Sequence, residues 1–144
     1  MYSARTVANY VINWSHDNNA EITNLRLQKL LYFLQGEMCA ATGERLIEDD
    51  FEAWKLGPVI PDIYRDFSVY SSFDIPRQMN SKGNIAENDA KEMDKILEKY
   101  KKYTTWALVE RSHAEDPWYS IYDIFGEDTE IPFELIKSYY TKEN

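Results

Sequence analysis

The amino-acid sequence predicts an all-α fold: one mainly helical domain over residues 1–144, with about seven helices and the option of one minor β-hairpin. Apolar residues recur at three- and four-residue spacing through most of the chain. Ser, Thr, Pro and Gly stand where these helices would begin or end. A length of 144 residues fits a single domain, and a hydrophobic content of 44% is enough for a core.

The first helix is expected over residues 3–16, and the second is the strongest in the chain. Thr23 can cap the start of the second helix and Gly43 can end it. Its apolar residues lie on more than one face, which indicates packing from several sides and a central position. Gln28 and Lys29 are expected on its polar side. The apolar residues are Leu25, Leu27, Leu30, Leu31, Tyr32, Phe33, Leu34, Met38 and Ala41.

Residues 51–61 contain two prolines and a glycine, which exclude a helix interior and favour a short extended piece with a tight turn. Pro61 can occupy the first position of the next helix, which carries Ile63 and Tyr64. Residues 71–87 are polar and are expected to form a mobile loop or a small hairpin.

Four further helices are expected in the second half of the chain. A charged helix over residues 88–102 turns Met93, Ile96, Leu97 and Tyr100 inward. The others begin at Thr104 or Thr105, at Pro117 and at Pro132, and Gly126 ends the helix that Pro117 starts.

The formal net charge of −9 is spread evenly along the chain. Direct nucleic-acid binding is not expected, because such binding depends on Lys and Arg. The charge suits a basic protein partner, or it serves solubility alone. Cys39 stands alone and is expected to be a buried structural thiol, so no disulfide is needed. With no secretory leader and no apolar stretch of about 20 residues, a cytoplasmic protein without membrane contact is expected.

No motif for catalysis, metal binding or cofactor binding stands out, so a non-enzymatic protein is expected. One Cys and two distant His cannot form a structural zinc site, and no Gly-rich phosphate loop is present. The acidic cluster of Glu48, Asp49, Asp50 and Glu52 is interpreted as a solvated loop.

His113 is interpreted as a residue whose ring bonds a backbone carbonyl and holds a turn. The alternative is an enzyme that uses His113 with Glu110 or Asp116. Aromatic residues near loop junctions, including Trp54, Tyr64, Trp106 and Trp118, are either core residues or partner contacts.

Three segments together resemble the Panacea domain family, which includes SocA-type antitoxins and phage-associated GepA-like proteins. They are residues 27–33 (LQKLLYF), residues 53–64, which fit the pattern AW-x-x-GPV-x-P-x-x-Y, and residues 112–118 (SHAEDPW), which fit TH-x-x-x-PW with Ser112 in place of Thr. Residues 131–140 are similar to the closing helix of the family.

The resemblance implies a helical bacterial or phage-associated antitoxin that neutralises a toxin by direct contact. The family's toxins are diverse, and the toxin is expected to be encoded by an adjacent gene. The alternative is a phage-associated regulatory or proteolytic adaptor. Homo-oligomerisation is left open. The contact surface is expected near residues 54–64 and Tyr32. The candidate partner-binding or motif residues are Gln28, Lys29, Tyr32, Trp54, Lys55, Gly57, Pro58, Tyr64, His113, Pro117 and Trp118.

Overall fold

The computed structural model describes residues 1–79 and 84–142. Within these residues the chain forms seven α-helices, one 3-10 turn and a small three-stranded sheet, which confirms the mainly helical class. The helices are α1 (Ala4–Asp17), α2 (Asn24–Thr42), α3 (Pro61–Phe67), α4 (Glu87–Lys101), α5 (Thr105–His113), α6 (Asp116–Phe125) and α7 (Phe133–Thr141). The 3-10 turn is η1 (Ser68–Tyr70), and the strands are β1 (Phe51–Trp54), β2 (Gly57–Val59) and β3 (Thr129–Ile131).

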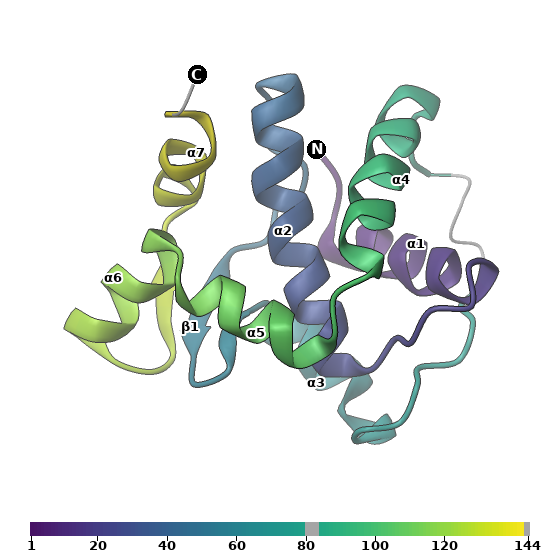
Figure 1. Ribbon diagram of the computed structural model, residues 1–144, viewed down its shortest axis with the longest axis horizontal. Coiled ribbons are helices and arrows are strands. Elements are labelled where there is room, and N and C mark those ends of the chain that lie inside the picture. The colour runs from purple at the N-terminus through teal and green to yellow at the C-terminus, as the bar shows by residue number, and fades with distance from the viewer. Residues whose placement is uncertain (80–83, 143–144) are drawn as a thin grey trace.

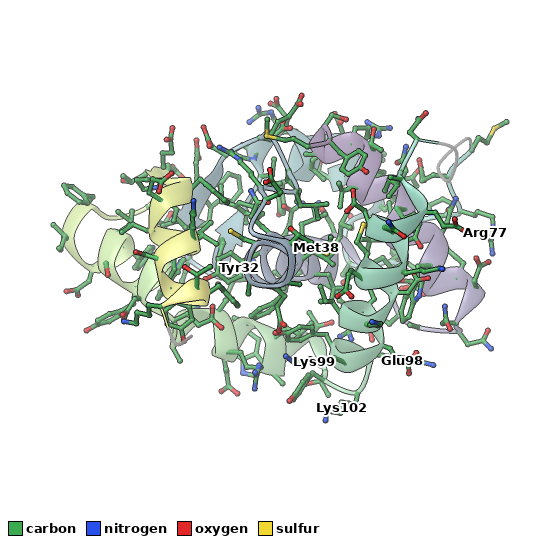
Figure 2. The ribbon with its side chains drawn as sticks, turned by 90° about the horizontal axis from the view of Figure 1, so that it is seen from above. Tyr32, Met38, Arg77, Glu98, Lys99 and Lys102 are labelled. Atoms are coloured by element: carbon green, nitrogen blue, oxygen red, sulfur yellow. The ribbon has the colours of Figure 1, made fainter. Side chains whose placement is uncertain are left out.

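The helix α2 is the central element, as the sequence predicted. It stands upright in the middle of the molecule, with α7 on one side and α4 on the other (Figure 1). Figure 2 looks along α2 and shows side chains from the surrounding elements directed towards it. Most of its residues are buried, including Tyr32, Phe33 and Leu34 at 0% exposure. A helix enclosed in this way is stabilised mainly by packing of its side chains.

The helix ends confirm the local signals in the sequence. The Thr23 hydroxyl accepts a hydrogen bond from the Arg26 N–H, and Gly43 ends α2 in the left-handed conformation. The Thr104 hydroxyl caps α5 in the same way. Pro61 and Pro117 lie in the first turns of α3 and α6, where a missing N–H costs nothing.

Close packing of α7 against α2 depends on Gly36. A Cβ at this position would overlap the ring of Tyr140. The two helices therefore approach closely only because residue 36 has no side chain. The Tyr140 ring also makes an edge-on contact with Tyr32 of α2, at a centroid distance of 6.2 Å.

The sheet differs from the expectation in two respects. Its order is β2-β1-β3, and the third strand, which the sequence did not predict, pairs Ile131 with Phe51 and Thr129 with Ala53. Three residues are too few to show alternation, so β3 is identified only by the strand that it pairs with. The second difference is the place of the hairpin. A small hairpin was one of the two forms expected for residues 71–87, but the described residues of that segment contain no strand, and the hairpin lies at residues 51–59.

The described part of the predicted loop is attached to α1 and to the segment before α2. Ile75 is fully buried, its N–H donates to the Ile22 carbonyl, and its own carbonyl contacts His16 Nε2 at 2.7 Å. Gln78 exchanges hydrogen bonds with the side chain of Asn13. The remainder, residues 80–83 with Gly83, lies outside the described residues, and mobility of this segment stays a prediction.

Candidate functional site: a clamped hairpin beside an apolar groove

The β1–β2 hairpin is turned by Lys55 and Leu56, which are exposed at its tip. Gly57 follows with a φ of +115°, a conformation that side chains disfavour. A Cβ on Gly57 would also come within 2.7 Å of Ser112 Oγ and 2.8 Å of Lys29 Cε. The hairpin therefore packs directly onto α2 and α5, and only glycine fits at this point.

The outer edge of β2 is covered by two polar side chains of α2. Lys29 Nζ donates to the Pro58 carbonyl at 2.7 Å, and Gln28 Oε1 accepts from the Ile60 N–H at 3.0 Å. Pro58 has no N–H of its own, so its carbonyl is the group that must be satisfied here. Gln28 and Lys29 were predicted on the polar side of α2, but both side chains are fully buried. Their polar partners are backbone groups of the sheet edge.

Lys29 is a fully buried amine whose Nζ donates to the Pro58 carbonyl. Removal from water lowers its pKa to about 7, because burial penalises the charged form. The amine can donate to the Pro58 carbonyl whether or not it carries the charge, so the hydrogen bond persists in both states.

The turn between α5 and α6 holds the hairpin from the other side. Trp118 Nε1 donates to the Trp54 carbonyl at 2.8 Å, and His113 Nε2 contacts the Lys55 carbonyl at 3.1 Å. Because a carbonyl only accepts, His113 Nε2 must carry the proton. Burial lowers the pKa of His113, which favours the neutral imidazole, and in that form the proton on Nε2 is the one that reaches the carbonyl. The His113 and Trp118 rings stack at 4.1 Å. The expectation that His113 bonds a backbone carbonyl is confirmed.

Three sequence segments thus meet at one hairpin. We call Gln28, Lys29, His113 and Trp118 the hairpin clamp, because each of these side chains bonds a backbone group of residues 54–60. The clamp uses main-chain acceptors and one main-chain donor, so it fixes the path of the hairpin. The outward side chains of the hairpin are left free for other contacts.

Tyr32 does not lie at the surface, where we expected a partner contact. It is fully buried, and its hydroxyl donates to Glu115 Oε1 at 2.8 Å. The Tyr140 hydroxyl donates to the same oxygen at 2.7 Å. Burial raises the pKa of Glu115, while these two hydrogen bonds oppose the shift. Pro117 is buried as well, so neither Tyr32 nor Pro117 lies at the surface of the folded protein.

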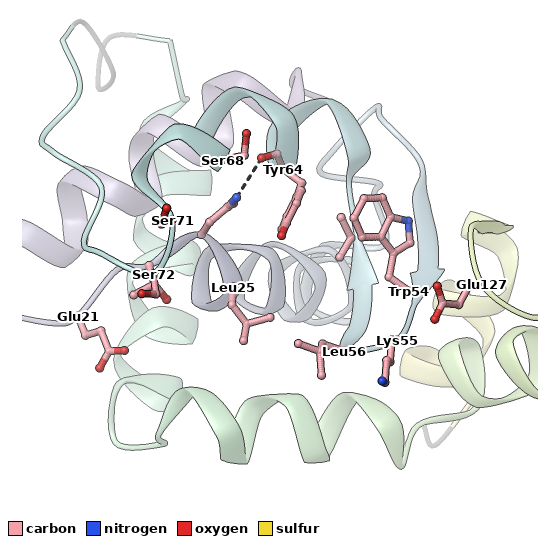
Figure 3. A pocket seen from close by; sticks show the side chains of 13 residues that line it. Glu21, Leu25, Trp54, Lys55, Leu56, Tyr64, Ser68, Ser71, Ser72 and Glu127 are labelled. Carbon is pink, nitrogen blue, oxygen red and sulfur yellow. Dashed lines mark hydrogen bonds between the residues drawn. The ribbon is translucent and has the colours of Figure 1, made fainter.

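A groove with a volume of about 660 Å³ runs along the outward side of the hairpin (Figure 3). Its aromatic wall is formed by Trp54 and Tyr64, whose rings meet at 5.1 Å in an edge-on arrangement. The Asn24 amide donates to the Tyr64 carbonyl at 2.9 Å and so ties α3 to the start of α2. The lining residues are Glu21, Thr23, Asn24, Leu25, Trp54, Lys55, Leu56, Val59, Tyr64, Ser68, Ser71, Ser72 and Glu127.

Of the candidate residues, only Trp54, Lys55 and Tyr64 line this groove. Leu56 falls within residues 54–64, where the contact surface was expected, but Leu25 and Glu127 were missed as lining residues. Leu25 lies off the main apolar face of α2, which was a usable signal. Glu127 gave none, because it is a single residue in a turn. The candidates that do not line the groove are Gln28, Lys29, Tyr32, Gly57, Pro58, His113, Pro117 and Trp118.

The described residues offer no group of three or more His, Cys, Asp or Glu side chains that could hold a metal ion. In the acidic segment, Asp50 pairs with Arg45 at 2.9 Å, Asp49 accepts from the Ala4 N–H, and Glu52 accepts from Trp54 Nε1. These carboxylates therefore have structural partners. Asp50 is exposed, as expected for a solvated loop, but Glu52 belongs to β1 and is half-buried, so the interpretation is wrong for Glu52.

Cys39 is buried, as expected, and burial raises the pKa of its thiol. In the described part of the chain, no helix has both the length and the apolar character that a membrane crossing requires.

The family model described as "Antitoxin SocA-like, Panacea domain" matches residues 27–119. This range contains the whole hairpin clamp and most of the groove. A curated relative, antitoxin SocA of Caulobacter vibrioides, is 48% identical over 66 residues, which are 46% of this chain and 35% of the relative. The match thus spans about a third of the length of that relative. No solved structure matches the chain.

Proposed function

Because the chain belongs to the SocA-like Panacea domain family, we propose that it is a non-enzymatic antitoxin that neutralises a toxin by direct binding at the groove. The observation that carries the proposal is the groove itself, an apolar surface with Trp54 and Tyr64 as its wall. We expect the toxin to be encoded by an adjacent gene and the pair to act in the cytoplasm.

The groove has the properties of a binding hot spot. Trp and Tyr contribute most to the energy of protein interfaces, since each buries a large area and keeps one polar tip. The hairpin that carries Trp54 is already fixed by the clamp. A preorganised surface loses little conformational entropy on binding, so more of the contact energy appears as affinity.

The charge of the chain supports a basic partner. A net charge of −9 attracts a positively charged protein and repels nucleic acid. Homo-oligomers stay an open part of the proposal.

The test is neutralisation in cells and binding in solution. The adjacent-gene protein is expressed alone, with the wild-type chain, and with two variants that share one chemistry. Leu56→Glu places a charge in the groove, and Leu135→Glu places the same charge on α7. The two leucines are equally exposed, at 38% and 37%. We expect growth rescue and co-purification with the wild type and Leu135→Glu, and loss of both with Leu56→Glu.

Two outcomes would contradict the proposal. If the wild type neither rescues growth nor co-purifies with the adjacent-gene protein, it is no antitoxin for that protein. If Leu56→Glu, shown by its thermal unfolding to be folded, rescues as well as the wild type, the toxin does not bind at the groove.

A second candidate function is the adaptor that delivers a client to a protease. An adaptor needs two separate surfaces, and α6 exposes Tyr119, Ile124 and Phe125 at 55%, 70% and 64%, none of which lines the groove. A pulse-chase measurement of toxin half-life decides the matter. An adaptor shortens the half-life, whereas an antitoxin that acts by blocking alone leaves it unchanged.

A further inference from the structure

The groove is apolar along its middle and carries charge at its ends. Glu21 lies at one end, before α2, and Glu127 lies beside Lys55 at the other (Figure 3). Leu25 and Leu56 lie between these ends (Figure 3). An occupant must therefore bring an apolar side chain to the middle of the groove and meet carboxylates beyond it.

The occupant cannot add a strand to β2. The outer edge of β2 is already bonded to α2, through Lys29 to the Pro58 carbonyl and through Gln28 to the Ile60 N–H. Strand addition needs free backbone groups at a sheet edge. Recognition at this groove therefore depends on side chains, and the sequence of the bound segment matters more than its backbone.

The two carboxylates at the ends are available to cations. Glu21 accepts a hydrogen bond from the Thr105 hydroxyl at 3.3 Å, and Glu127 accepts one from the Tyr122 hydroxyl at 3.3 Å. Neither glutamate belongs to an ion pair among the described residues, in contrast to Glu37, which pairs with Lys99 at 2.7 Å.

Glu21 also lines a neighbouring pocket together with Lys101, Lys102 and Arg26. The Arg26 guanidinium interacts electrostatically with Glu21, but its hydrogen bonds go to other groups. It donates to the Thr105 hydroxyl and to the carbonyls of Tyr100 and Lys101. At the other end, Lys55 is exposed and forms no ion pair within the described residues. Each end of the groove therefore combines one glutamate with nearby basic side chains, and within the described residues neither glutamate forms an ion pair with them.

We propose that the groove binds a toxin segment in which one apolar or aromatic side chain is flanked by Lys or Arg. The apolar side chain lies over Leu25 and Leu56, against Trp54 and Tyr64. The basic side chain pairs with Glu21, and a second one pairs with Glu127. This inference rests on the proposed antitoxin function and adds the chemistry of the bound segment.

The first experiment reverses charges one at a time. Glu21→Lys and Glu127→Lys are compared with Glu98→Lys, a control on the exposed face of α4 (Figure 2). Calorimetric titration with the purified adjacent-gene protein gives Kd at low and high salt. We expect Glu21→Lys and Glu127→Lys to raise Kd at least tenfold, and Glu98→Lys to change it less than twofold. The salt dependence should weaken only in the two groove variants.

The outcomes separate this inference from the function on which it rests. If Leu56→Glu abolishes binding while Glu21→Lys behaves like Glu98→Lys, the antitoxin role stands and the basic segment is wrong. If the wild type does not bind the adjacent-gene protein at all, the function fails and the inference fails with it.

A second experiment identifies the occupant directly. A photo-cross-linking amino acid replaces Leu56, or Leu135 as the control, and the cross-linked toxin peptide is sequenced by mass spectrometry. We expect a peptide from position 56 only, with an apolar residue and a Lys or Arg within about four residues of it, the reach of one helical turn or a short extended stretch. A peptide without basic residues, or a cross-link to a second copy of this chain, overturns the proposal.

Discussion

The two sides of the β1–β2 hairpin differ in what they contact. The inward side is fixed by the hairpin clamp, which bonds the carbonyls of Trp54, Lys55 and Pro58. The outward side presents the side chains of Trp54, Lys55 and Leu56 to the groove. One segment of eleven residues, 51–61, thus combines a rigid backbone with a free surface.

This difference explains the motif that the segment resembles. In the pattern AW-x-x-GPV, the specified Gly57 and Pro58 are buried against α2, whereas the two unspecified positions are Lys55 and Leu56, at the exposed tip. The family signature therefore describes mainly how the hairpin is held. Under the proposed function, contacts with a toxin would vary at the tip without disturbing the clamp.

The largest effect is expected from Gly57→Ala on the clamped side. The new Cβ would lie too close to Ser112 Oγ and Lys29 Cε, and the alanine would have to adopt a φ of +115°. Backbone strain and overpacking together should lower the free energy of unfolding by about 3 kcal/mol or more. Gly43→Ala is the matched control, because its φ is +78° but nothing lies within 4 Å. We expect a loss of about 1 kcal/mol there. Urea denaturation followed by circular dichroism measures both, and equal losses would contradict the clamp.

The second prediction concerns the pH dependence that Lys29 gives to the clamp. Its pKa is about 7 in the folded chain and 10.5 when unperturbed. Between these values the unfolded chain binds more protons, so stability rises with pH. From pH 7 to pH 9 the gain attributable to Lys29 should be about 2 kcal/mol, at a limiting slope of about 1.4 kcal/mol per pH unit.

The comparison variant is Lys29→Met, which has an unbranched side chain one atom shorter than that of Lys and cannot titrate. Urea titrations of both proteins at several pH values give the difference in stability, and subtraction removes all other titrating groups. A difference that stays constant from pH 7 to pH 9 would show that Lys29 is not buried against the hairpin.

The third prediction separates a tryptophan of the clamp from one at the surface. Trp118→Phe removes the N–H that bonds the Trp54 carbonyl and should cost about 1–2 kcal/mol. Trp106→Phe, on α5, changes a ring that is 58% exposed and should cost less than about 0.5 kcal/mol. Thermal unfolding of both variants tests this ranking, and the reverse order would contradict it.

The sequence predicted what depends on neighbours along the chain. Thr23, Gly43 and Pro61 mark helix ends through local bonds and local backbone restrictions, so their roles could be inferred. Gln28 and Lys29 were misplaced because helical periodicity treats a polar residue as solvated. Periodicity contains no information about a sheet edge that lies about thirty residues away in the chain.

The candidate site was predictable only in part, for the same reason. Trp54 and Tyr64 were identified because aromatic residues near a turn are informative alone. The groove needs Leu25, Leu56 and Glu127 as well, which come from three separate segments. Their proximity follows from the packing of α2, the hairpin and the α6–β3 turn, and no single stretch of sequence records it.

The sharpest test of the comparison, with a small effect on stability, is expected from Trp54→Leu. The backbone of Trp54 belongs to the clamp, since its carbonyl accepts from Trp118, while its indole belongs to the groove. The variant keeps the carbonyl and removes only the indole. The free energy of unfolding should fall by less than about 1 kcal/mol, because the side chain is half-buried. The Kd for the toxin should rise at least tenfold, as expected for an interface hot spot.

Trp118→Phe is the complementary variant in the same binding titration. It weakens the clamp and leaves the groove side chains in place. At a temperature where the variant is folded, its Kd for the toxin should therefore lie within about threefold of the wild-type value. That change is smaller than the change expected when one hot-spot residue is lost. The two variants then form a crossed pair: one loses binding and keeps stability, and the other loses stability and keeps binding. If both properties fall together in both variants, the two sides of the hairpin do not act separately, and the groove cannot be varied independently of the fold.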